Sequence, residues 1–188
     1  KPSATISIND KAHPDVPALV ESIDFGSDGL RYRRLDVKSQ LERFNSPIWF
    51  HAISNGELAG VYVLDKRNLL FNGQQITGYY RGVLGVGARW QGQGLGRQLV
   101  NSAMQWMDSQ SQDKAILSYG CIDKSNTRSL QLLGSTGTTL GPALSMYMLY
   151  RQFPRKCCEL ESVSEIHSGD LATLSDRVYG TCVLRDVT

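Results

Sequence analysis

A glycine-rich turn over residues 84–96 joins an apolar strand to an amphipathic helix near the middle of this 188-residue chain. Residues 75–86 form a long, largely apolar run that is typical of a strand. After the turn, Leu95, Leu99 and Met107 recur at helical spacing and share one face of a helix. A strand that passes directly into an amphipathic helix must bury one face of each element, which requires a layered fold of sheet and helix.

Two Asn-Gly pairs, Asn55-Gly56 and Asn72-Gly73, precede this turn. Asn-Gly between apolar runs is the strongest short-range signal for a β-hairpin. The flanking runs cover residues 48–54, 58–64, 68–71 and 75–86. The sequence therefore predicts an antiparallel meander before the helix.

Other periodic segments complete the element order β-α-α-β-β-β-α-β-α-β. Besides the meander, we expect strands at residues 3–8, 115–119 and 143–153 and helices at 16–23, 35–44, 95–107 and 125–133. A meander that ends in a βαβ unit forces a mixed, mostly antiparallel sheet with helices on both faces, which is an α+β fold. We assign residues 1–155 to this domain. Residues 156–188 form a C-terminal tail with an extra strand and helix, which could also open a second, truncated repeat of the domain.

The composition argues against several classes of function. Twenty Lys and Arg against eighteen Asp and Glu give a net charge of +2, so we expect no nucleic-acid partner. No apolar run approaches the roughly 20 residues that cross a bilayer, and the N-terminus lacks the profile of a signal peptide. We therefore expect a cytoplasmic protein without membrane contact. The four cysteines have no metal-ligand spacing, and we expect reduced thiols and no bound metal.

The turn has the properties of an anion site. The first backbone N–H groups of a helix have no intrahelical partner, and together with the helix dipole they attract phosphate. Glycines at 92, 94 and 96 would remove the Cβ atoms that keep a pyrophosphate away, and Arg97 adds a counter-charge. A P-loop would need Lys after its last glycine, and a dinucleotide fingerprint would need G-x-G-x-x-G in a parallel sheet; this segment matches neither pattern.

The hexapeptide Gln91-Gly92-Gln93-Gly94-Leu95-Gly96 resembles the [QR]-x-x-G-x-[GA] signature of the GNAT N-acetyltransferases, and the element order over residues 3–153 is similar to that of the family. The resemblance implies an acyltransferase that uses acetyl-CoA and acts on a primary amine of a small molecule or peptide. A homodimer or a tandem GNAT domain is left open. The implied contacts to CoA come from Leu84, Val86, Gln91, Gly92, Gln93, Gly94, Leu95, Gly96 and Arg97, with the N–H of Val86 polarising the acetyl carbonyl.

A second region, Asn126 to Thr138, is similar to N-x-x-[AS]-x-x-L-Y-x-x-x-G-F of the same family, which implies that Asn126 and Ser129 also contact CoA. Leu133 stands where the family has the tyrosine that protonates the leaving thiolate, and Thr138 stands in place of the phenylalanine. Leucine cannot donate a proton. The sequence therefore predicts either another donor or a domain that binds CoA without efficient turnover.

Several residues could take over the proton transfers. Tyr147 on the last strand is a candidate catalytic residue, and Asp123 could relay the proton of the amine. Tyr119 and Cys121 follow the helix on the next strand, where core packing and a buried thiol are the more ordinary roles.

Strict alternation along the strand at 75–86 would place Leu84 and Val86 on one face and Tyr79 and Arg81 on the other. Arg81 could then line the acceptor site, although a solvent-facing or ion-paired arginine is the ordinary expectation. The leading hypothesis is an N-acetyltransferase. The alternative is a non-catalytic acyl-CoA-binding or regulatory module.

Overall fold

The computed structural model describes residues 4–25, 32–71, 74–110, 116–122, 126–138 and 184–186. Its strands are β1 (Thr5–Asn9), β2 (Pro47–Ser54), β3 (Glu57–Phe71), β4 (Gln74–Val86), β5 (Leu117–Tyr119) and β6 (Leu184–Asp186). Its helices are α1 (Val16–Glu21), α2 (Val37–Leu41), the 3-10 turn η1 (Ala88–Trp90), α3 (Leu95–Gln110) and α4 (Thr127–Gly134). The elements follow the predicted order, and the strand predicted at 143–153 lies outside the described residues.

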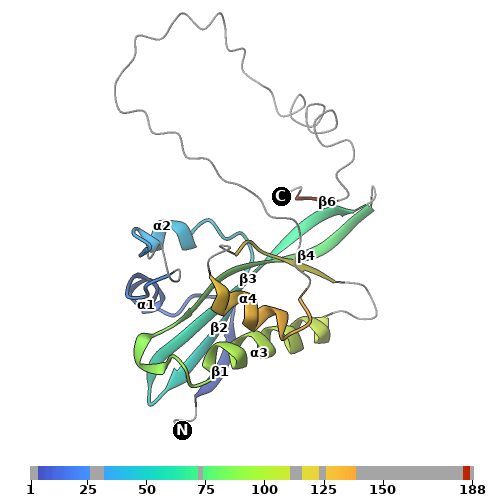
Figure 1. The fold of residues 1–188 in the computed structure, drawn as a ribbon. Helices are drawn as coiled ribbons and strands as arrows, with labels where there is room; N and C mark the ends of the chain where they lie inside the picture. Colours follow the sequence, from blue (N-terminus) through green and yellow to red (C-terminus); the bar gives the residue numbers. More distant parts are fainter. Residues whose placement is uncertain are drawn as a thin grey trace, which may run out of the picture.

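The sheet is mixed, with the path β1-β2-β3-β4-β5 (Figure 1). Neighbours from β1 to β4 are antiparallel, and β5 is parallel to β4 because α3 returns the chain across the sheet between them. β6, from the C-terminal tail, pairs antiparallel with β3 over Leu69–Phe71, beyond the part of β3 that β2 covers. The predicted α+β class is confirmed.

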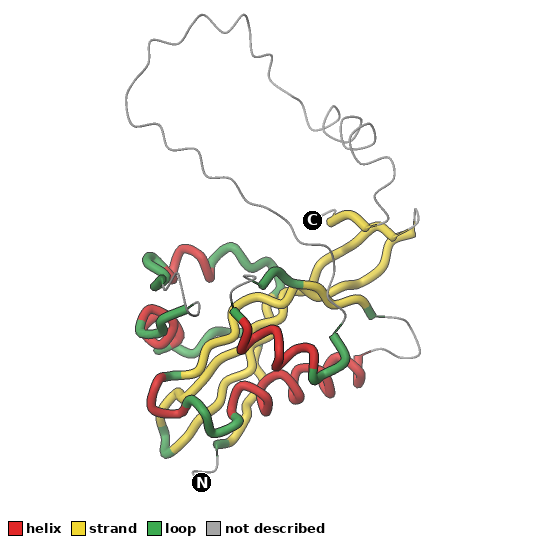
Figure 2. The backbone as a smooth tube through the Cα atoms, viewed as in Figure 1, coloured by secondary structure: helices red, strands yellow, loops and turns green. Residues whose placement is uncertain are grey.

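Helices cover both faces of the sheet: α1 and α2 lie on one side, the α1 face, and α3 and α4 lie on the other, the α3 face (Figure 2). On the α3 face, Leu99 and Leu133 pack with Phe50 of β2. On the α1 face, Val16 and Trp49 belong to a second buried cluster. Helix α3 buries the predicted apolar stripe, which comprises Leu95, Leu99, Val100, Ala103 and Met107. Among the helices that the structure describes, none is both long and apolar enough to span a bilayer.

Strand β3 is a single element that includes the polar stretch 65–67 between the apolar runs 58–64 and 68–71. The polar stretch stays in the sheet because its buried carboxylate has partners. Asp65 is fully buried, and its Oδ1 accepts the N–H of Ser46 at 2.8 Å while its Oδ2 pairs with Arg67. The N–H of Ser46 and the charge of Arg67 offset much of the cost of burying this carboxylate.

The register of β4 against β3 contains a β-bulge, because two β4 residues, Gly82 and Val83, lie opposite the single β3 residue Val63. Both bulge residues face the α1 side of the sheet. The alternation of side chains is therefore shifted by one residue, and Arg81 and Leu84 both lie on the α3 face. The prediction that they lie on opposite faces was wrong for this reason.

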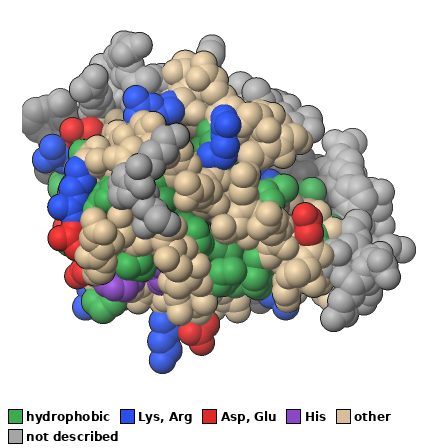
Figure 3. Space-filling view, turned by 90° about the horizontal axis from the view of Figure 1, so that it is seen from below, with side chains coloured by type: hydrophobic (Ala, Val, Ile, Leu, Met, Phe, Trp, Pro, Cys, Tyr) green, Lys and Arg blue, Asp and Glu red, His purple; other side chains and the backbone are tan. Residues whose placement is uncertain are grey.

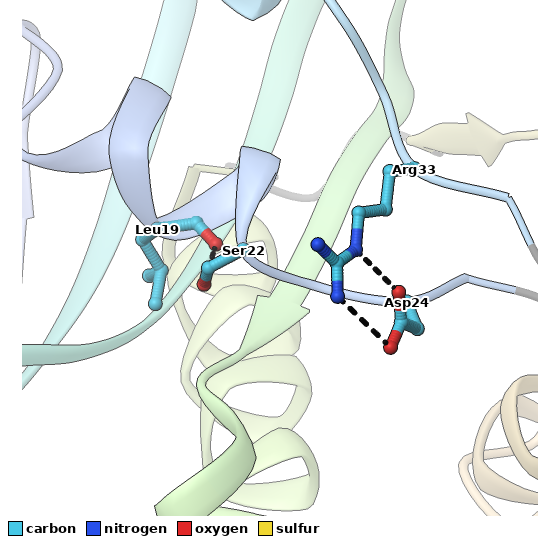
Figure 4. Close-up of polar contacts among 4 residues, drawn as sticks. All are labelled: Leu19, Ser22, Asp24 and Arg33. Atoms are coloured by element: carbon cyan, nitrogen blue, oxygen red, sulfur yellow. Dashed lines mark hydrogen bonds and ion pairs between the residues drawn. The ribbon is translucent and has the colours of Figure 1, made fainter.

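The segment that follows α1 is tied down by polar contacts (Figure 4). The hydroxyl of Ser22 donates to the carbonyl oxygen of Leu19 at 2.7 Å, at the end of the helix. Nε of Arg33 donates to Oδ1 of Asp24 at 2.6 Å, which joins the end of this segment to the chain that leads into α2. Both side chains of that ion pair are exposed.

Candidate functional site

Strand β4 runs well past the end of β5. The two strands pair only over Gly78–Tyr80 and Leu117–Tyr119, whereas β4 continues to Val86. Just after β5 the chains are still close, since a Cβ on Gly120 would lie 3.0 Å from the carbonyl oxygen of Arg81. Beyond this point no described strand lies beside β4 on this side. We call this stretch of β4 the open edge.

Two backbone N–H groups point to the open edge. The N–H of Gly87 donates to the carbonyl oxygen of Ala59 on β3 at 2.9 Å. Because successive N–H groups along a strand point to alternate edges, those of Val86 and Leu84 point away from β3. The side chains of Val86 and Leu84 pack on the α3 face, so these two residues offer backbone rather than side-chain atoms to the open edge.

The turn between β4 and α3 carries a row of backbone N–H groups without a protein partner. Gly92 and Gly94 have φ values of 76° and 84°, a left-handed conformation that glycine adopts without strain. The carbonyl oxygen of Gly94 accepts the N–H of Gln98 at 3.1 Å, so helical bonding begins there. Within the described part of the chain, no acceptor pairs with the N–H groups of residues 92–97. Such a row at a helix N-terminus suits an anion.

The three glycines of the turn have different roles. A Cβ added at Gly92 or Gly94 would meet no atom within 4 Å, so their backbone angles require glycine and the space beside them is open. A Cβ at Gly96 would lie 3.6 Å from Leu132 and 3.8 Å from Val86, which are ordinary contacts. The expectation that the missing Cβ of Gly96 clears space for a phosphate was therefore wrong, because that position faces α4 and β4.

Gln91 connects the turn to its surroundings. Its backbone N–H donates to the carbonyl oxygen of Ala88 at 3.3 Å, so the row of free N–H groups begins one residue later than predicted. Its side-chain Nε2 donates to the carbonyl oxygen of Val86 at 2.9 Å, and its Oε1 accepts from Arg128 of α4 at 3.3 Å. These contacts hold the end of β4, the turn and α4 together.

The other side chains of the turn divide into buried and exposed. Leu95 is buried in the cluster on the α3 face and fixes the start of the helix to the sheet. Gln93 is exposed, and its Nε2 donates to the carbonyl oxygen of Arg89 at 3.0 Å. Arg97 is exposed and forms no ion pair with a described residue. Its charge is therefore available beside the row of N–H groups.

Helix α4 begins with a side-chain cap and ends in the core. Oδ1 of Asn126 accepts the N–H of Ser129 at 3.1 Å, so these two predicted CoA contacts are engaged with each other through those atoms. Leu133 is 7% exposed and packs in the cluster on the α3 face. Leu133 thus places a buried apolar group at the position where the family that the sequence resembles has a tyrosine hydroxyl.

Arg81 joins three elements at the start of the open edge. Its Nη2 and Nε donate to Oγ of Ser118 on β5 at 2.7 and 3.1 Å, and its Nη1 donates to Oγ1 of Thr138 at 2.8 Å. Its Nη2 also lies 3.6 Å from Sδ of Met104 on α3. Arg81 is half-buried, and no Asp or Glu among the described residues pairs with it. The sequence predicted a solvent-facing or ion-paired arginine, and the structure shows neither.

Two buried tyrosines lie near Arg81. Burial raises the pKa of the Tyr62 hydroxyl to about 12, while the charge of Arg81 acts in the opposite direction. Burial also raises the pKa of Tyr79. Both hydroxyls therefore remain protonated at neutral pH and cannot serve as bases there.

The residues predicted to transfer protons are not brought together by the described part of the chain. Tyr119 lies beside Tyr80, with ring centroids 5.6 Å apart. Cys121 is exposed, although a buried thiol was expected. Asp123 and Tyr147 lie outside the described residues.

The described surface has hollows at the β1–α1 loop and beside the turn. A groove of about 540 Å³ lies between the β1–α1 loop, α2 and the start of β2, with Lys11, Lys38 and Trp49 in its lining. A smaller hollow of about 290 Å³ adjoins the turn and includes Trp90 and Gln93. In the view from below, charged side chains lie mainly around the margin and hydrophobic side chains in the middle (Figure 3). No group of three or more His, Cys, Asp or Glu among the described residues is arranged to hold a metal.

The sequence matches the model of a known protein family. The model of the acetyltransferase (GNAT) family matches residues 18–137, an interval that runs from α1 to just past α4 and includes the whole turn. No curated protein sequence matches the chain significantly.

Solved structures share the fold at low sequence identity. An aminoglycoside acetyltransferase from an uncultured soil metagenomic sample, in complex with trehalose, is 18% identical with a TM-score of 0.53, over 78% of this chain and 97% of its own. A transcriptional regulator from Bacillus halodurans C-125 is 16% identical with a TM-score of 0.56, over 77% and 100%. The aminoglycoside acetyltransferase AAC(6')-Iy, in complex with the bisubstrate analogue CoA-S-monomethyl-acetylneamine, is 14% identical with a TM-score of 0.54, over 78% and 99%.

Proposed function

We propose an acyltransferase function for this chain, which belongs to the acetyltransferase (GNAT) family. It would transfer an acetyl or other small acyl group from acyl-CoA to a primary amine of a small molecule or peptide. The observation that carries the proposal is the free row of N–H groups at residues 92–97, which continues into the open edge of β4. The family domain would comprise residues 1–155, with residues 156–188 as a tail that contributes β6 to the sheet.

The diphosphate of CoA would bind to the N–H groups of the turn. Six N–H groups that have no partner among the described residues, together with the positive end of the α3 dipole, favour an anion there, and Arg97 adds a full charge. The open space beside Gly92 and Gly94 lets a phosphate approach the backbone. The pantetheine arm would then lie along the open edge, where its amides can pair with the backbone of Leu84 and Val86 as an added strand would.

Acyl transfer needs a polarised thioester carbonyl and a nearby amine. A backbone N–H of the open edge, at Leu84 or Val86, would donate to the carbonyl oxygen, which becomes more negative as the amine attacks. Backbone donors of this kind are fixed by the sheet and need no reorganisation during the reaction. Asp123 and Tyr147 remain our candidates for moving the protons of the amine and the thiol.

Membership of the family supports an amine as the acceptor. The solved structures of AAC(6')-Iy and of the metagenomic enzyme are those of aminoglycoside acetyltransferases, which favours a small molecule with a primary amine as the first substrate class to test. A peptide amine is the other class.

A non-catalytic acyl-CoA-binding or regulatory module is the alternative. Buried Leu133 favours it, because a leucine side chain has no proton to donate. The similar fold of a transcriptional regulator also favours it. Incubation with acetyl-CoA and a panel of amines, with release of free thiol as the readout, separates the two. Saturable binding of acetyl-CoA without thiol release over a wide panel would establish the module.

The binding site is tested by two variants of one residue. Gly94→Asp and Gly94→Asn place side chains of the same shape, and the same backbone strain, at a position with φ of 84°. Only Asp adds a negative charge beside the diphosphate. We expect Gly94→Asp to lose at least about tenfold more affinity for acetyl-CoA than Gly94→Asn, measured by calorimetry on folded protein. Equal affinities of the two variants would remove the turn as the diphosphate site.

A further inference from the structure

The guanidinium of Arg81 is held in place but not neutralised. All of its described hydrogen-bond partners are neutral: the hydroxyls of Ser118 and Thr138 and the thioether of Met104. Two hydroxyls and a sulfur orient a guanidinium without cancelling its charge. Because no described carboxylate neutralises this half-buried guanidinium, its charge is available to attract an anion.

Its place in the fold limits what that anion can be. β4 and β5 pair up to Tyr80, so Arg81 is the first β4 residue beyond this pairing, at the start of the open edge. The β-bulge turns its side chain to the α3 face, the same face as Leu84 and Val86. Thr138, which accepts from Arg81, donates its own N–H to the carbonyl oxygen of Leu133 at 3.2 Å. The guanidinium therefore lies against the last turn of α4, near the position where the resembling family has a tyrosine.

The length of CoA matches this geometry. The pantetheine arm has about as many bonds as four residues of backbone and spans about 13 Å when extended. An arm that starts beside Val86 and follows the open edge toward Arg81 brings its sulfur to the level of the bulge at Gly82 and Val83. Arg81 is the next residue along the strand.

We propose that Arg81 stabilises the thiolate of CoA as it leaves, in place of the tyrosine that Leu133 replaces. This rests on the proposed function. The amine nitrogen forms a bond to the acyl carbon, the carbon–sulfur bond breaks, and the sulfur keeps the bonding pair as a thiolate beside the guanidinium. The proton of the amine passes to the base of the proposed function, and the thiolate is protonated by the acid of the proposed function before CoA is released, with Arg81 stabilising it as an anion until then. Arg81 supplies charge and no proton, since a guanidinium stays protonated at any physiological pH.

The test compares CoA with desulfo-CoA, which lacks the sulfur, on the full chain by calorimetry. A nearby cation lowers the pKa of a thiol, so the bound sulfur ionises at a lower pH than the thiol of free CoA. We expect the affinity ratio of CoA to desulfo-CoA to rise severalfold from about pH 6 to about pH 8 in the wild type. In Arg81→Met this rise disappears.

Matched variants separate charge from structure. Arg43→Met removes an equally charged but exposed side chain and should keep the wild-type rise. Arg81→Gln keeps donors for Ser118 and Thr138 without the charge, and it replaces Arg81→Met in the test if the latter does not fold. A flat ratio in the wild type, or the same rise in the neutral Arg81 variants, overturns the role of Arg81. Loss of binding of both ligands to the wild type would instead overturn the proposed function.

Discussion

Asp65 and Arg67 form an ion pair on one face of β3, with Oδ2 of the carboxylate 2.6 Å from Nη2 of the guanidinium. The carboxylate side chain is completely buried, and the guanidinium side chain is 20% exposed. The other carboxylate oxygen accepts the N–H of Ser46, which precedes β2. This pair keeps the polar middle of β3 inside the sheet and fixes the entry to β2.

Removal of this carboxylate is expected to be costly. Asp65→Ala removes the buried half of the ion pair and the acceptor of the Ser46 N–H, and we expect the free energy of unfolding to fall by about 3–5 kcal/mol in urea titrations. The control is Asp24→Ala, which breaks the exposed ion pair with Arg33 and should change stability little. Equal losses in the two variants would show that burial does not set the cost.

His51 is expected to make stability depend on pH. Its Nε2 accepts the N–H of His13 at 3.1 Å, and burial, aided by the charge of His13, lowers the pKa of His51 to about 4. The unfolded chain, with an ordinary pKa of about 6.5, binds a proton more readily than the folded protein. Stability is therefore full above about pH 6.5 and is lost as the pH falls toward 4, by on the order of 2 kcal/mol.

The check is His51→Gln, which keeps an acceptor for His13 but does not titrate. The free energy of unfolding of this variant should fall less between neutral pH and about pH 4.5 than that of the wild type. An identical fall in both proteins would assign the pH dependence to other groups.

Two glycine-to-alanine substitutions should have opposite effects. A Cβ at Gly82 would lie 2.7 Å from a methyl of Val63 and 2.8 Å from the ring of Phe44, so Gly82→Ala should destabilise by about 1–3 kcal/mol. A Cβ at Gly134, in the last turn of α4, would meet no atom within 4 Å, so Gly134→Ala should stabilise by about 0.4–1 kcal/mol. Thermal unfolding of both variants decides this, and destabilisation by Gly134→Ala would contradict the described packing.

Local patterns were sufficient to predict the turn and α3. The period changes at Leu95, and the buried stripe of the helix follows from its spacing alone. The turn at Asn55 and Gly56 was equally predictable from the sequence, because both residues adopt the positive φ values that this dipeptide favours. Together these segments define the candidate site, since the turn lies where β4 ends and α3 begins.

Features that depend on pairing between distant segments could not be predicted. The bulge in β4 arises from its register with β3, and no local pattern at Gly82 distinguishes a bulge from an ordinary strand glycine. The contacts of Arg81 join residues 37 and 57 positions away, so the sequence offered no way to bring them together. Both features are set by tertiary structure, which outweighs local preference.

The bulge gives β4 one residue more than its pairing with β3 requires. Deleting Gly82 would place Val83 opposite Val63. Arg81 would remain opposite Leu64, and Leu84 opposite Tyr62, so each side chain would keep its partner on β3 and its face of the sheet. A regular strand is straighter than a bulged one. A shortened β4 could therefore keep its core and its register and yet run alongside β5 for longer. The separation of β4 from β5 therefore depends on the one extra residue in β4. The length of the strand constrains this separation more tightly than the identity of any side chain does.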